Sequence, residues 1–594
     1  MKTALPRIIL GLLLLSATFA ADATGRTLVA WQPWTETLFA DAQREDRLVI
    51  LNLEAVWCHW CHVMDDRTYS NRDVADYLAA HYLAVRVDHD ARPDLANRYR
   101  RYGWPATIIF APDGTELVKR SGYMAPEDFL RLLEAVVADP TPEAAARLAP
   151  PEVFAESPFL IDDLRKSLRE NHASSLDHRL GGLRTAQKFL DRDTVSYAMA
   201  RARQGDADNE AWARRSIDAS LALIDPVWGG AYQYSTHGDW DHPHFEKIMS
   251  TNAGLLRIYA LAYAQWRDPA YLRAAQDIRR YLVDFLASPD GAFYTSQDAD
   301  LVPGEHSEAY FALDDAARRA RGLPKIDEHR YARENGWAAE ALVTLHEVSG
   351  DTQALQQAET AVRWVVENRA LPEGGFRHDA QDAAGPYLGD TLAMGRAFLA
   401  LYRATAERHW LDRAARAVDF IDANFRQEGA GFLSGVPGDN PIRPVPLTDE
   451  NVSAIRFANL LFHYTGERDY RELAEHGMRY LATPDVAFAR INESGVLLAE
   501  MELALDPDHF TIIGPKNDAL ARELFVTAQR EPGGYKRVEW WDTAEGALPN
   551  PDVQYPVLER PAAFICTHGR CSLPAFTPAA YLETIARIVA PAAP

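Results

Sequence analysis

Two cysteines with two residues between them, Cys58 and Cys61, are the positions in this 594-residue sequence whose type and spacing most directly suggest chemistry. The apolar run 48–53 precedes them and is typical of a buried strand, so Cys58 is expected at the start of the next helix. Unpaired N–H groups and the helix dipole favour a thiolate there. Such a thiolate attacks a disulfide, and Cys61 then resolves the mixed disulfide. A protonated His59 between the two sulfurs would stabilise the thiolate further.

The elements that must position this pair are those of a thioredoxin-like domain, expected over residues 26–140. The cysteines are followed, in order, by helix 73–81, strand 83–88, strand 107–110 and helix 126–138. Pro105 stands just before the second of these strands, where thioredoxin-like proteins carry a cis-proline. A cis X-Pro bond is a rare feature of folded proteins. This order of elements therefore favours a redox role for Cys58, His59, Cys61 and Pro105.

Three other interpretations of the cysteine motif remain open from the sequence. Cys58 to His62 also reads C-x-x-C-H, the attachment pattern of a c-type haem. Two Cys and two His within five residues suggest a zinc site, although ligands so close in sequence rarely reach one tetrahedral ion together. The pair is also compatible with a structural disulfide that never turns over. We expect no cofactor and no metal site.

A second cysteine pair, Cys566 and Cys571, lies in a small α/β region expected over residues 506–594. Four cysteines allow three pairings, and the local one, Cys58–Cys61 with Cys566–Cys571, is the most economical. Two alternatives are a second redox pair that exchanges with the first, and a zinc site with His568. The elements expected here are strands 510–514, 536–541 and 562–566 and helices 518–529 and 581–589.

Between these regions, a Pro- and Ala-rich linker (141–159) leads into a helical region over residues 160–505. Amphipathic helices recur there in pairs, separated by glycine-aromatic loops such as Gly374-Gly375-Phe376. Repeated helical hairpins with such loops indicate a closed (α/α)6 barrel, with an open solenoid as the alternative. The fold class is therefore multidomain: a thioredoxin-like α/β domain, an all-α barrel and a small α/β unit. The loop aromatics are expected around one mouth of the barrel, where they either stack on sugars or simply pack.

Four polar residues of the barrel alternate in two short segments, His244 with Glu246 and Asp298 with Asp300. Paired carboxylates act as acid and base in glycoside cleavage. A histidine with a carboxylate moves a proton at a sugar carbon, as an epimerase or isomerase requires. The alternative is a buried hydrogen-bonded network that holds the barrel closed.

Several of these motifs together resemble the spermatogenesis-associated protein 20 family, which joins a thioredoxin-like domain to a six-hairpin glycosidase-like domain. The matching segments are W-C-H-W-C-H-V-M at 57–64, P-H-F-E-K at 243–247 and Q-D-A-D at 297–300. An acidic-aromatic stretch that begins at Glu308 also corresponds, so the resemblance adds Glu308 to the candidate barrel site. The helical half also resembles N-acylglucosamine 2-epimerase-like barrels. The family's A-P-K-F-P segment is A-Q-K-F-L here, which weakens any role for Lys188.

The N-terminus indicates where the protein is located, and the net charge indicates which partners are unfavourable. Residues 1–20 read as a signal peptide with an apolar core at 8–15, and an uncleaved membrane anchor is the alternative. We therefore expect an exported protein, periplasmic or extracellular, that is soluble after cleavage. The formal net charge of −23 disfavours nucleic acid as a partner.

These observations support three hypotheses of different class. The first is an exported thiol–disulfide oxidoreductase that acts on a protein or small-molecule disulfide, with a possible sugar ligand in the barrel. The second is a sugar epimerase, isomerase or glycoside hydrolase whose thioredoxin-like domain senses redox state. The third is a non-catalytic binding protein.

Overall fold

The computed structural model describes residues 27–143, 153–438, 442–567 and 569–589. The N-terminal unit is built on a four-stranded sheet in the order β2-β1-β3-β4. Strand β1 pairs parallel with β2 and antiparallel with β3, and β4 is antiparallel to β3. The elements are α1 (Leu38–Glu45), β1 (Leu48–Glu54), α2 (His59–Arg67), α3 (Arg72–His81), β2 (Tyr82–Asp88), α4 (Pro93–Tyr99), β3 (Ala106–Phe110), β4 (Glu116–Ser121) and α5 (Pro126–Ala138). This is the predicted thioredoxin-like fold, with α1, α4 and β4 as elements that the sequence did not reveal.

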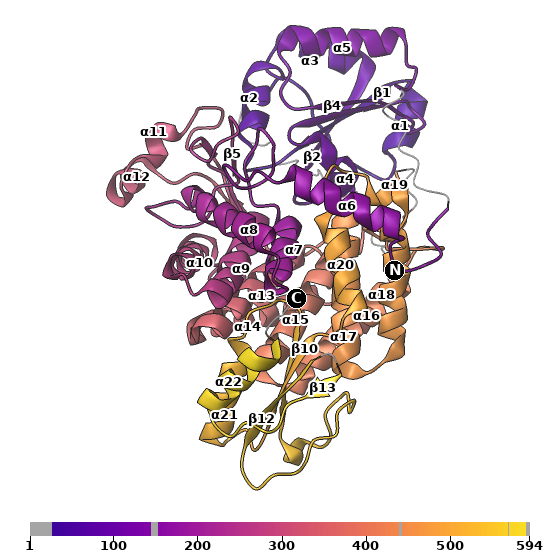
Figure 1. Cartoon of the computed structure of the whole chain (residues 1–594). Coiled ribbons are helices and arrows are strands. Elements are labelled where there is room, and N and C mark those ends of the chain that lie inside the picture. The colour runs from indigo at the N-terminus through magenta and orange to yellow at the C-terminus, as the bar shows by residue number, and fades with distance from the viewer. Residues whose placement is uncertain (1–26, 144–152, 439–441, 568, 590–594) are drawn as a thin grey trace, which may run out of the picture.

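The helical region closes into a ring of paired helices (Figure 1). The inner helices are α7 (Arg192–Arg203), α9 (Met249–Trp266), α13 (Ala332–Ser349), α15 (Leu388–Thr405), α17 (Thr448–Thr465) and α20 (Ser494–Ala504). Their outer partners are α8 (Ala207–Ser220), α10 (Pro269–Tyr281), α14 (Thr352–Arg369), α16 (Arg408–Phe425), α18 (Arg468–Leu481) and, for α20, α6 (Asp162–Ser175). Helix α20 packs against both α17 and α7, which closes the ring. The predicted (α/α)6 arrangement is therefore confirmed, and its last hairpin joins the first and last helices of the region.

The glycine-aromatic loops serve the packing of this ring. In three of the loops, one backbone N–H and C=O are both bound by the amide of an asparagine in the first turns of an inner helix. Asn252 binds Ala231, Asn335 binds Phe293 and Asn451 binds Phe432. The loop aromatics Tyr232, Phe293, Phe376 and Phe432 are at most 4% exposed. We therefore assign these rings to packing, and Tyr232 also lines a cavity.

The centre of the ring is occupied by ion pairs. Arg257 and Arg396 both contact Glu340, and Arg456 binds Glu502. The space left among these side chains is a cavity of about 40 Å³. That is room for about one water molecule. A sugar ring does not fit into this cavity.

The C-terminal unit repeats the sheet of the N-terminal unit. Its strand order is β11-β10-β12-β13, with β10 parallel to β11 and antiparallel to β12. The elements are β10 (Asp508–Ile513), α21 (Ala519–Gln529), β11 (Lys536–Trp541), β12 (Ala562–Thr567), β13 (Arg570–Cys571) and α22 (Pro578–Val589). Asp518 caps α21 as Cys58 caps α2, and Pro561 precedes β12 as Pro105 precedes β3. This unit is thus a second thioredoxin-like sheet in which an aspartate stands at the position of the redox cysteine.

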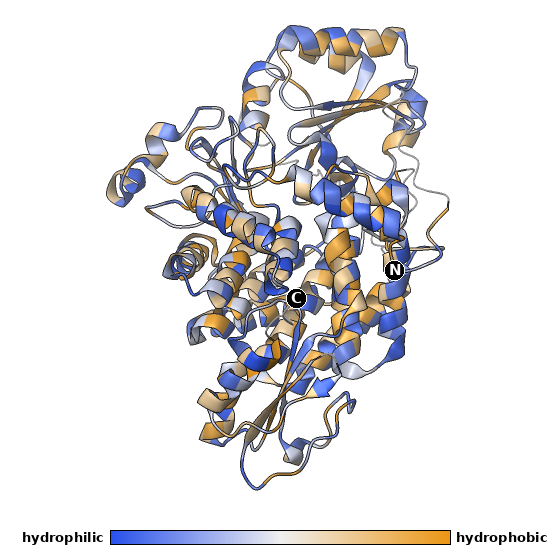
Figure 2. Ribbon diagram, viewed as in Figure 1, coloured by the Kyte–Doolittle hydropathy of each residue, from blue (hydrophilic) through white to orange (hydrophobic). Residues whose placement is uncertain are grey.

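The two α/β units lie at opposite ends of the ring (Figure 1). The N-terminal unit covers the end where the inner helices begin, as shown by the ion pair between Arg100 and Asp449 of α17. The C-terminal unit covers the other end, where Val538 N–H donates to the hydroxyl of Tyr464 near the end of α17. Figure 2 shows mostly hydrophobic residues along α20 and mostly hydrophilic residues along α6. None of the described helices is both long enough and apolar enough to cross a bilayer. The expected signal peptide, residues 1–20, and residues 144–152 of the expected linker lie outside the described residues.

Candidate functional site

The cysteine pair lies where β1 passes into α2. Cys58 is the N-cap of α2, in an extended conformation, and its Sγ accepts a hydrogen bond of 3.2 Å from the N–H of Cys61. The two cysteines are joined as a disulfide, and Cys566 is likewise joined to Cys571. Because four N–H groups at a helix start lack partners in the helix, this end stabilises a thiolate at Cys58 after reduction.

Aromatic rings from the N-terminal unit surround the disulfide. Trp57 donates its indole N–H to Asp90 at 2.7 Å and packs edge-on against Trp104. The Trp104–Pro105 peptide bond is cis, as the position of Pro105 predicted. Cys58 and Cys61 are each only 3% exposed, so the disulfide is shielded from solvent in this state.

A loop of the helical region, residues 298–307, lies against this part of the N-terminal unit, between β8 (Ser296–Gln297) and α11 (Glu308–Phe311). The backbone N–H of Ala299 lies 3.5 Å from the carbonyl of Trp57. The ring of His306 packs against His59 and Trp60 of α2, at centroid distances of 4.6 and 6.5 Å. The loop that carries Asp298 and Asp300 therefore lies directly against the helix that carries the disulfide.

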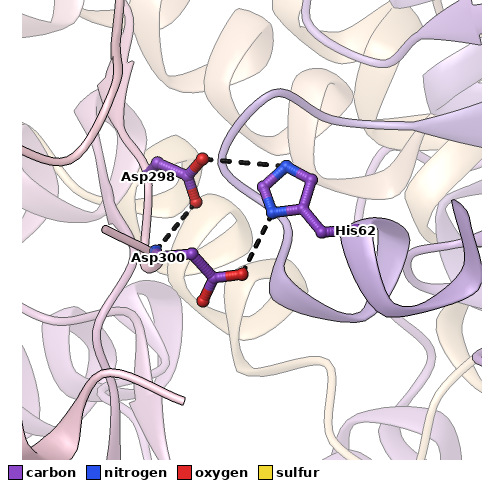
Figure 3. A group of neighbouring side chains, drawn as sticks. All are labelled: His62, Asp298 and Asp300. Carbon is purple, nitrogen blue, oxygen red and sulfur yellow. Dashed lines mark hydrogen bonds and ion pairs between the residues drawn. The ribbon is translucent and has the colours of Figure 1, made fainter. Parts of the chain in front are cut away.

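Two histidines of the cysteine motif bind the two aspartates of this loop, and Figure 3 shows the contacts of one of them, His62. His59 Nδ1 lies 2.8 Å from one oxygen of Asp300 and 3.0 Å from the other. His62 Nδ1 lies 3.1 Å from Asp300 Oδ2, and His62 Nε2 lies 3.7 Å from Asp298 Oδ2. The structure thus joins the predicted redox motif and two of the five predicted barrel residues into one cluster, which we call the His-Asp cluster (His59, His62, Asp298, Asp300).

The charges of the cluster are uneven. Burial opposes ionisation of Asp300, but hydrogen bonds from His59 and His62 outweigh it and lower the pKa of Asp300 to about 2. Burial raises the pKa of Asp298 to about 7. Although burial lowers the pKa of His62, the hydrogen bond that its ring donates to Asp300 and the charge of Asp298 raise the pKa above its ordinary value. Asp300 is therefore a fixed anion at neutral pH, and the proton balance of the cluster lies with His62 and Asp298.

A small sheet places these aspartates. Strand β8 (Ser296–Gln297) pairs with β7 (Lys247–Ile248) and with β9 (Ile326–Asp327). Continuing the β7–β8 register by one residue sets Glu246 opposite Asp298. Beyond β8, the N–H of Asp300 donates to Asp298, and Gly304 N–H donates to Asp300 at 2.8 Å.

The other predicted barrel residues do not share one cavity on the ring axis. Glu246 is 3% exposed, and its Oε2 makes no hydrogen bond within the described part of the chain. His244 stacks on Tyr234 with ring centroids 4.4 Å apart and lies 3.9 Å from Glu246. Glu308 belongs to α11 (Glu308–Phe311) and lines a separate cavity. The structure therefore separates the predicted barrel residues. Asp298 and Asp300 lie beside the dithiol, whereas Glu308 lies at the separate cavity.

That cavity has a volume of about 350 Å³ and lies beside α11. Its residues are Ala222, Pro226, Tyr232, Trp240, Asp241, Pro243, Phe245, Glu308, Phe311 and Ala312. Tyr232, Trp240 and Phe311 form buried parts of its wall, and the carboxylates of Asp241 and Glu308 are exposed. Nothing in the sequence pattern pointed to Trp240 or Asp241.

Two further predictions concern Lys188 and the rear cysteines. Lys188 is buried and donates to Asp177 at 2.7 Å and to the carbonyl of Leu183, which are contacts within the fold. Cys566 and Cys571 are directly paired residues of the β12–β13 hairpin. Because this hairpin lies at the far end of the ring from α2, exchange with Cys58 and Cys61 does not occur within one chain in this state (Figure 1).

Fold and site together define the class: a thioredoxin-like unit with a Cys-x-x-Cys disulfide, joined to an (α/α)6-type ring of helices. Residues 21–138 match a family, Thioredox_DsbH, described as a protein of unknown function, DUF255. The chain is 25% identical to human spermatogenesis-associated protein 20 over 421 residues, 65% of this chain and 50% of the relative. The predicted resemblance to that family is thus confirmed. The chain spans about half the length of the curated relatives it matches.

Two further similarities concern the separate parts. The chain is 24% identical over 103 residues to the thiol:disulfide interchange protein DsbD of Campylobacter jejuni, 17% of this chain and 18% of the relative. Among solved structures, a cellobiose 2-epimerase from Bacillus thermoamylovorans has a TM-score of 0.43 and 11% identity. It covers 54% of this chain and 86% of the epimerase.

Proposed function

We propose that the protein is a thiol–disulfide oxidoreductase whose redox centre is the Cys58–Cys61 pair. The observation that carries this proposal is the position of Cys58 as the N-cap of α2, at the point where β1 passes into the helix. A structural disulfide needs no such placement, whereas a redox thiol gains a stabilised thiolate from it. The similarity to a thiol:disulfide interchange protein over 103 residues supports the same role.

The proposed reaction balances as two thiol–disulfide exchanges. A substrate thiolate attacks Cys58 Sγ, the Cys58–Cys61 bond breaks, and Cys61 leaves as a thiolate. A second substrate thiolate then attacks the mixed disulfide, which releases the oxidised substrate and the Cys58 thiolate. The two protons lost by the substrate thiols end on the cysteine pair. The reverse sequence reduces a substrate disulfide, and the relative potentials of protein and partner set the direction.

In this reaction the His-Asp cluster keeps the site closed, because it holds the 298–307 loop against α2. Because Cys58 and Cys61 are shielded in the described state, the 298–307 loop must move away before a substrate thiol reaches Cys58. The histidines of α2 then lose or exchange their contacts with Asp300. We further propose that the protein is exported to the periplasm or outside the cell, where an oxidised Cys58–Cys61 pair persists.

The test is disulfide exchange with a reduced dithiol peptide and, in the presence of dithiothreitol, with insulin whose disulfides are intact. Wild-type protein is expected to oxidise or reduce one of them, and Cys58→Ser is expected to remove the activity. Cys571→Ser is the matched control, since it breaks the other disulfide and leaves the proposed centre intact. Wild-type protein that exchanges with neither substrate, or a Cys58→Ser variant as active as wild type, would contradict the proposal.

A second candidate function is saccharide binding in the cavity beside α11. The observation that favours it is the combination of aromatic walls at Tyr232, Trp240 and Phe311 with the carboxylates of Asp241 and Glu308. Flat aromatic faces pack against the C–H faces of sugars, and carboxylates accept hydrogen bonds from their hydroxyls. Quenching of tryptophan fluorescence by mono- and disaccharides tests it. Trp240→Phe and Glu308→Gln should weaken such binding, and no response to any saccharide would dismiss it.

A further inference from the structure

The imidazole of His62 lies between two carboxylates of a different part of the chain. Its Nδ1 is within hydrogen-bond distance of Asp300, and its Nε2 faces Asp298 (Figure 3). His62 and Asp300 are 238 residues apart in the sequence, so motif spacing did not reveal this site. His62, Asp298 and Asp300 each offer one ligand atom, and these atoms all lie within 4.8 Å of one another.

The two ring nitrogens of His62 lie at different distances from their carboxylates, and only one of these distances is that of a hydrogen bond. The 3.1 Å between Nδ1 and Asp300 is a hydrogen bond. The 3.7 Å between Nε2 and Asp298 Oδ2 is too long for one. Ligand atoms bound to one tetrahedral metal ion at about 2.0–2.2 Å are about 3.3–3.5 Å apart. The gap between Nε2 and Asp298 is therefore close to the width that a small divalent cation needs.

The charge around this gap also suits a cation. Glu246 lies opposite Asp298 in the β7–β8 register, on the same face of the small sheet. It is 3% exposed, and its Oε2 has no hydrogen-bond partner among the described residues. The neighbouring cation Lys247 is committed elsewhere, because its Nζ binds Asp225 at 2.7 Å and the carbonyl of Gly229. A buried carboxylate oxygen without a partner is costly unless a cation neutralises it.

The hydrogen bond from Nδ1 to Asp300 provides the support that a metal-binding histidine needs. Histidines that bind a metal through one nitrogen commonly donate the other N–H to a carboxylate, which fixes the tautomer and the orientation of the ring. Asp300 is itself held by His59 and by the N–H of Gly304. The lone pair of Nε2 is thereby directed at Asp298.

From this geometry we infer that the His-Asp cluster is a binding site for a divalent first-row transition metal ion. The ion lies between His62 Nε2 and Asp298, Asp300 holds the imidazole from behind, and Glu246 supplies further negative charge. Imidazole and carboxylate donors together suit zinc, iron and manganese, and binding displaces any proton carried by Nε2. This site does not depend on turnover of the disulfide, because none of its ligands is a cysteine.

The test is titration of the full chain with Zn²⁺, with both disulfides intact so that no thiolate competes for the ion. Isothermal titration calorimetry is expected to show one tight site per chain, and Zn²⁺ is expected to raise the thermal midpoint. In His62→Ala and in Asp298→Asn the affinity of this site should fall by at least tenfold. Asp298→Asn preserves the side-chain shape, so it keeps the test decisive if His62→Ala folds poorly.

His242→Ala is the matched control, because His242 forms an exposed pair with Asp239 at 2.8 Å elsewhere in the helical region. It should bind Zn²⁺ as tightly as wild type does. Absence of a tight site in the wild-type chain would overturn the inference. So would a site that survives in both His62→Ala and Asp298→Asn, or one that His242→Ala removes.

Discussion

His59 Nδ1 lies 2.8 Å from Asp300 Oδ1, which ties the helix that carries the disulfide to a loop 241 residues further along the chain. Both side chains are buried, at 6% and 1% exposure. Hydrogen bonds that involve a charged partner are about twice as strong as neutral ones. The contact therefore holds the 298–307 loop against the helix that begins after Cys58, and we expect access to the disulfide to require that this contact break.

The first prediction follows from this contact. Asp300→Ala removes the anchor of the loop to both His59 and His62. Hydrogen bonds to charged groups contribute about 1.5–3 kcal/mol each, so the open state should become at least about tenfold more populated. Reduction of the Cys58–Cys61 disulfide by dithiothreitol should accelerate by a similar factor. Quenching with an alkylating reagent and peptide mass spectrometry in the presence of EDTA measures this rate.

Two controls accompany that measurement. Reduction of Cys566–Cys571 in the same sample should keep its wild-type rate, because the hairpin lies at the other end of the ring. Asp239→Ala, which breaks an exposed His–Asp pair, should change neither rate. An unchanged rate for Cys58–Cys61 in Asp300→Ala would show that the loop does not limit access.

The thioredoxin-like unit was predictable because its signals are local. The apolar run before Cys58 and the position of Pro105 each depend on a few neighbouring residues. Strand β4 (Glu116–Ser121) escaped prediction because it carries charged residues and borders only β3 within its sheet. The second thioredoxin-like sheet was also missed, since Asp518 replaces the cysteine that marks the first one.

The candidate site was predictable only in part. The residue types of Cys58, His59, Asp298 and Asp300 marked them as chemical groups, but nothing local to either segment places the two aspartates against α2. That contact forms when the N-terminal unit packs against the ring. This packing depends on surfaces of the two units that are far apart in the sequence. The same reason explains why these aspartates were assigned to a barrel cavity.

The second prediction concerns Asp225, the single carboxylate between two buried cations. Its Oδ2 lies 2.7 Å from both Lys247 Nζ and Arg318 Nη1, and all three side chains are fully buried. Asp225→Asn leaves two buried cations without a counter-charge, which should lower the free energy of unfolding by about 3–5 kcal/mol. Lys247→Met leaves the Asp225–Arg318 pair intact and should cost less. Urea denaturation at neutral pH gives both values, and the reverse order would contradict this account of the triad.

The third prediction tests the asparagines of the inner helices that bind the glycine-aromatic loops (Asn252, Asn335 and Asn451). Asn335 binds the N–H and the carbonyl of Phe293 and also the carbonyl of Tyr331, at 2.7, 3.1 and 2.8 Å. Asn335→Ala leaves a buried donor and acceptor without partners, which should cost about 2–4 kcal/mol. Asn424→Ala removes a single hydrogen bond to the carbonyl of Phe420, and the expected cost is about 1 kcal/mol. Equal thermal midpoints for the two variants would show that the hydrogen bonds of Asn335 to the loop do not contribute specially to the stability of the ring.

The fourth prediction concerns acid stability and His463 of α17. Burial lowers the pKa of His463 to about 4, and its Nε2 has no hydrogen-bond partner among the described residues. The imidazole titrates near pH 6.5 in the unfolded chain. As the pH falls from about 6.5 to 4, the unfolded state therefore binds a proton that the folded state does not. Stability is fully present above pH 6.5 and decreases by up to about 1.4 kcal/mol per pH unit below it.

His463→Gln should flatten this dependence by up to one proton, because glutamine does not titrate. His476→Gln should act in the same direction, since burial also lowers the pKa of His476 to about 4. His409 is 55% exposed, so His409→Gln serves as the control and should leave the slope unchanged. Urea midpoints between pH 4 and 7 measure the slopes. If His463 is buried as a neutral imidazole, it must take up a proton when the protein unfolds in acid, and its replacement must reduce the slope. A His463→Gln variant with the wild-type slope would therefore mean that the acid loss of stability originates in other groups.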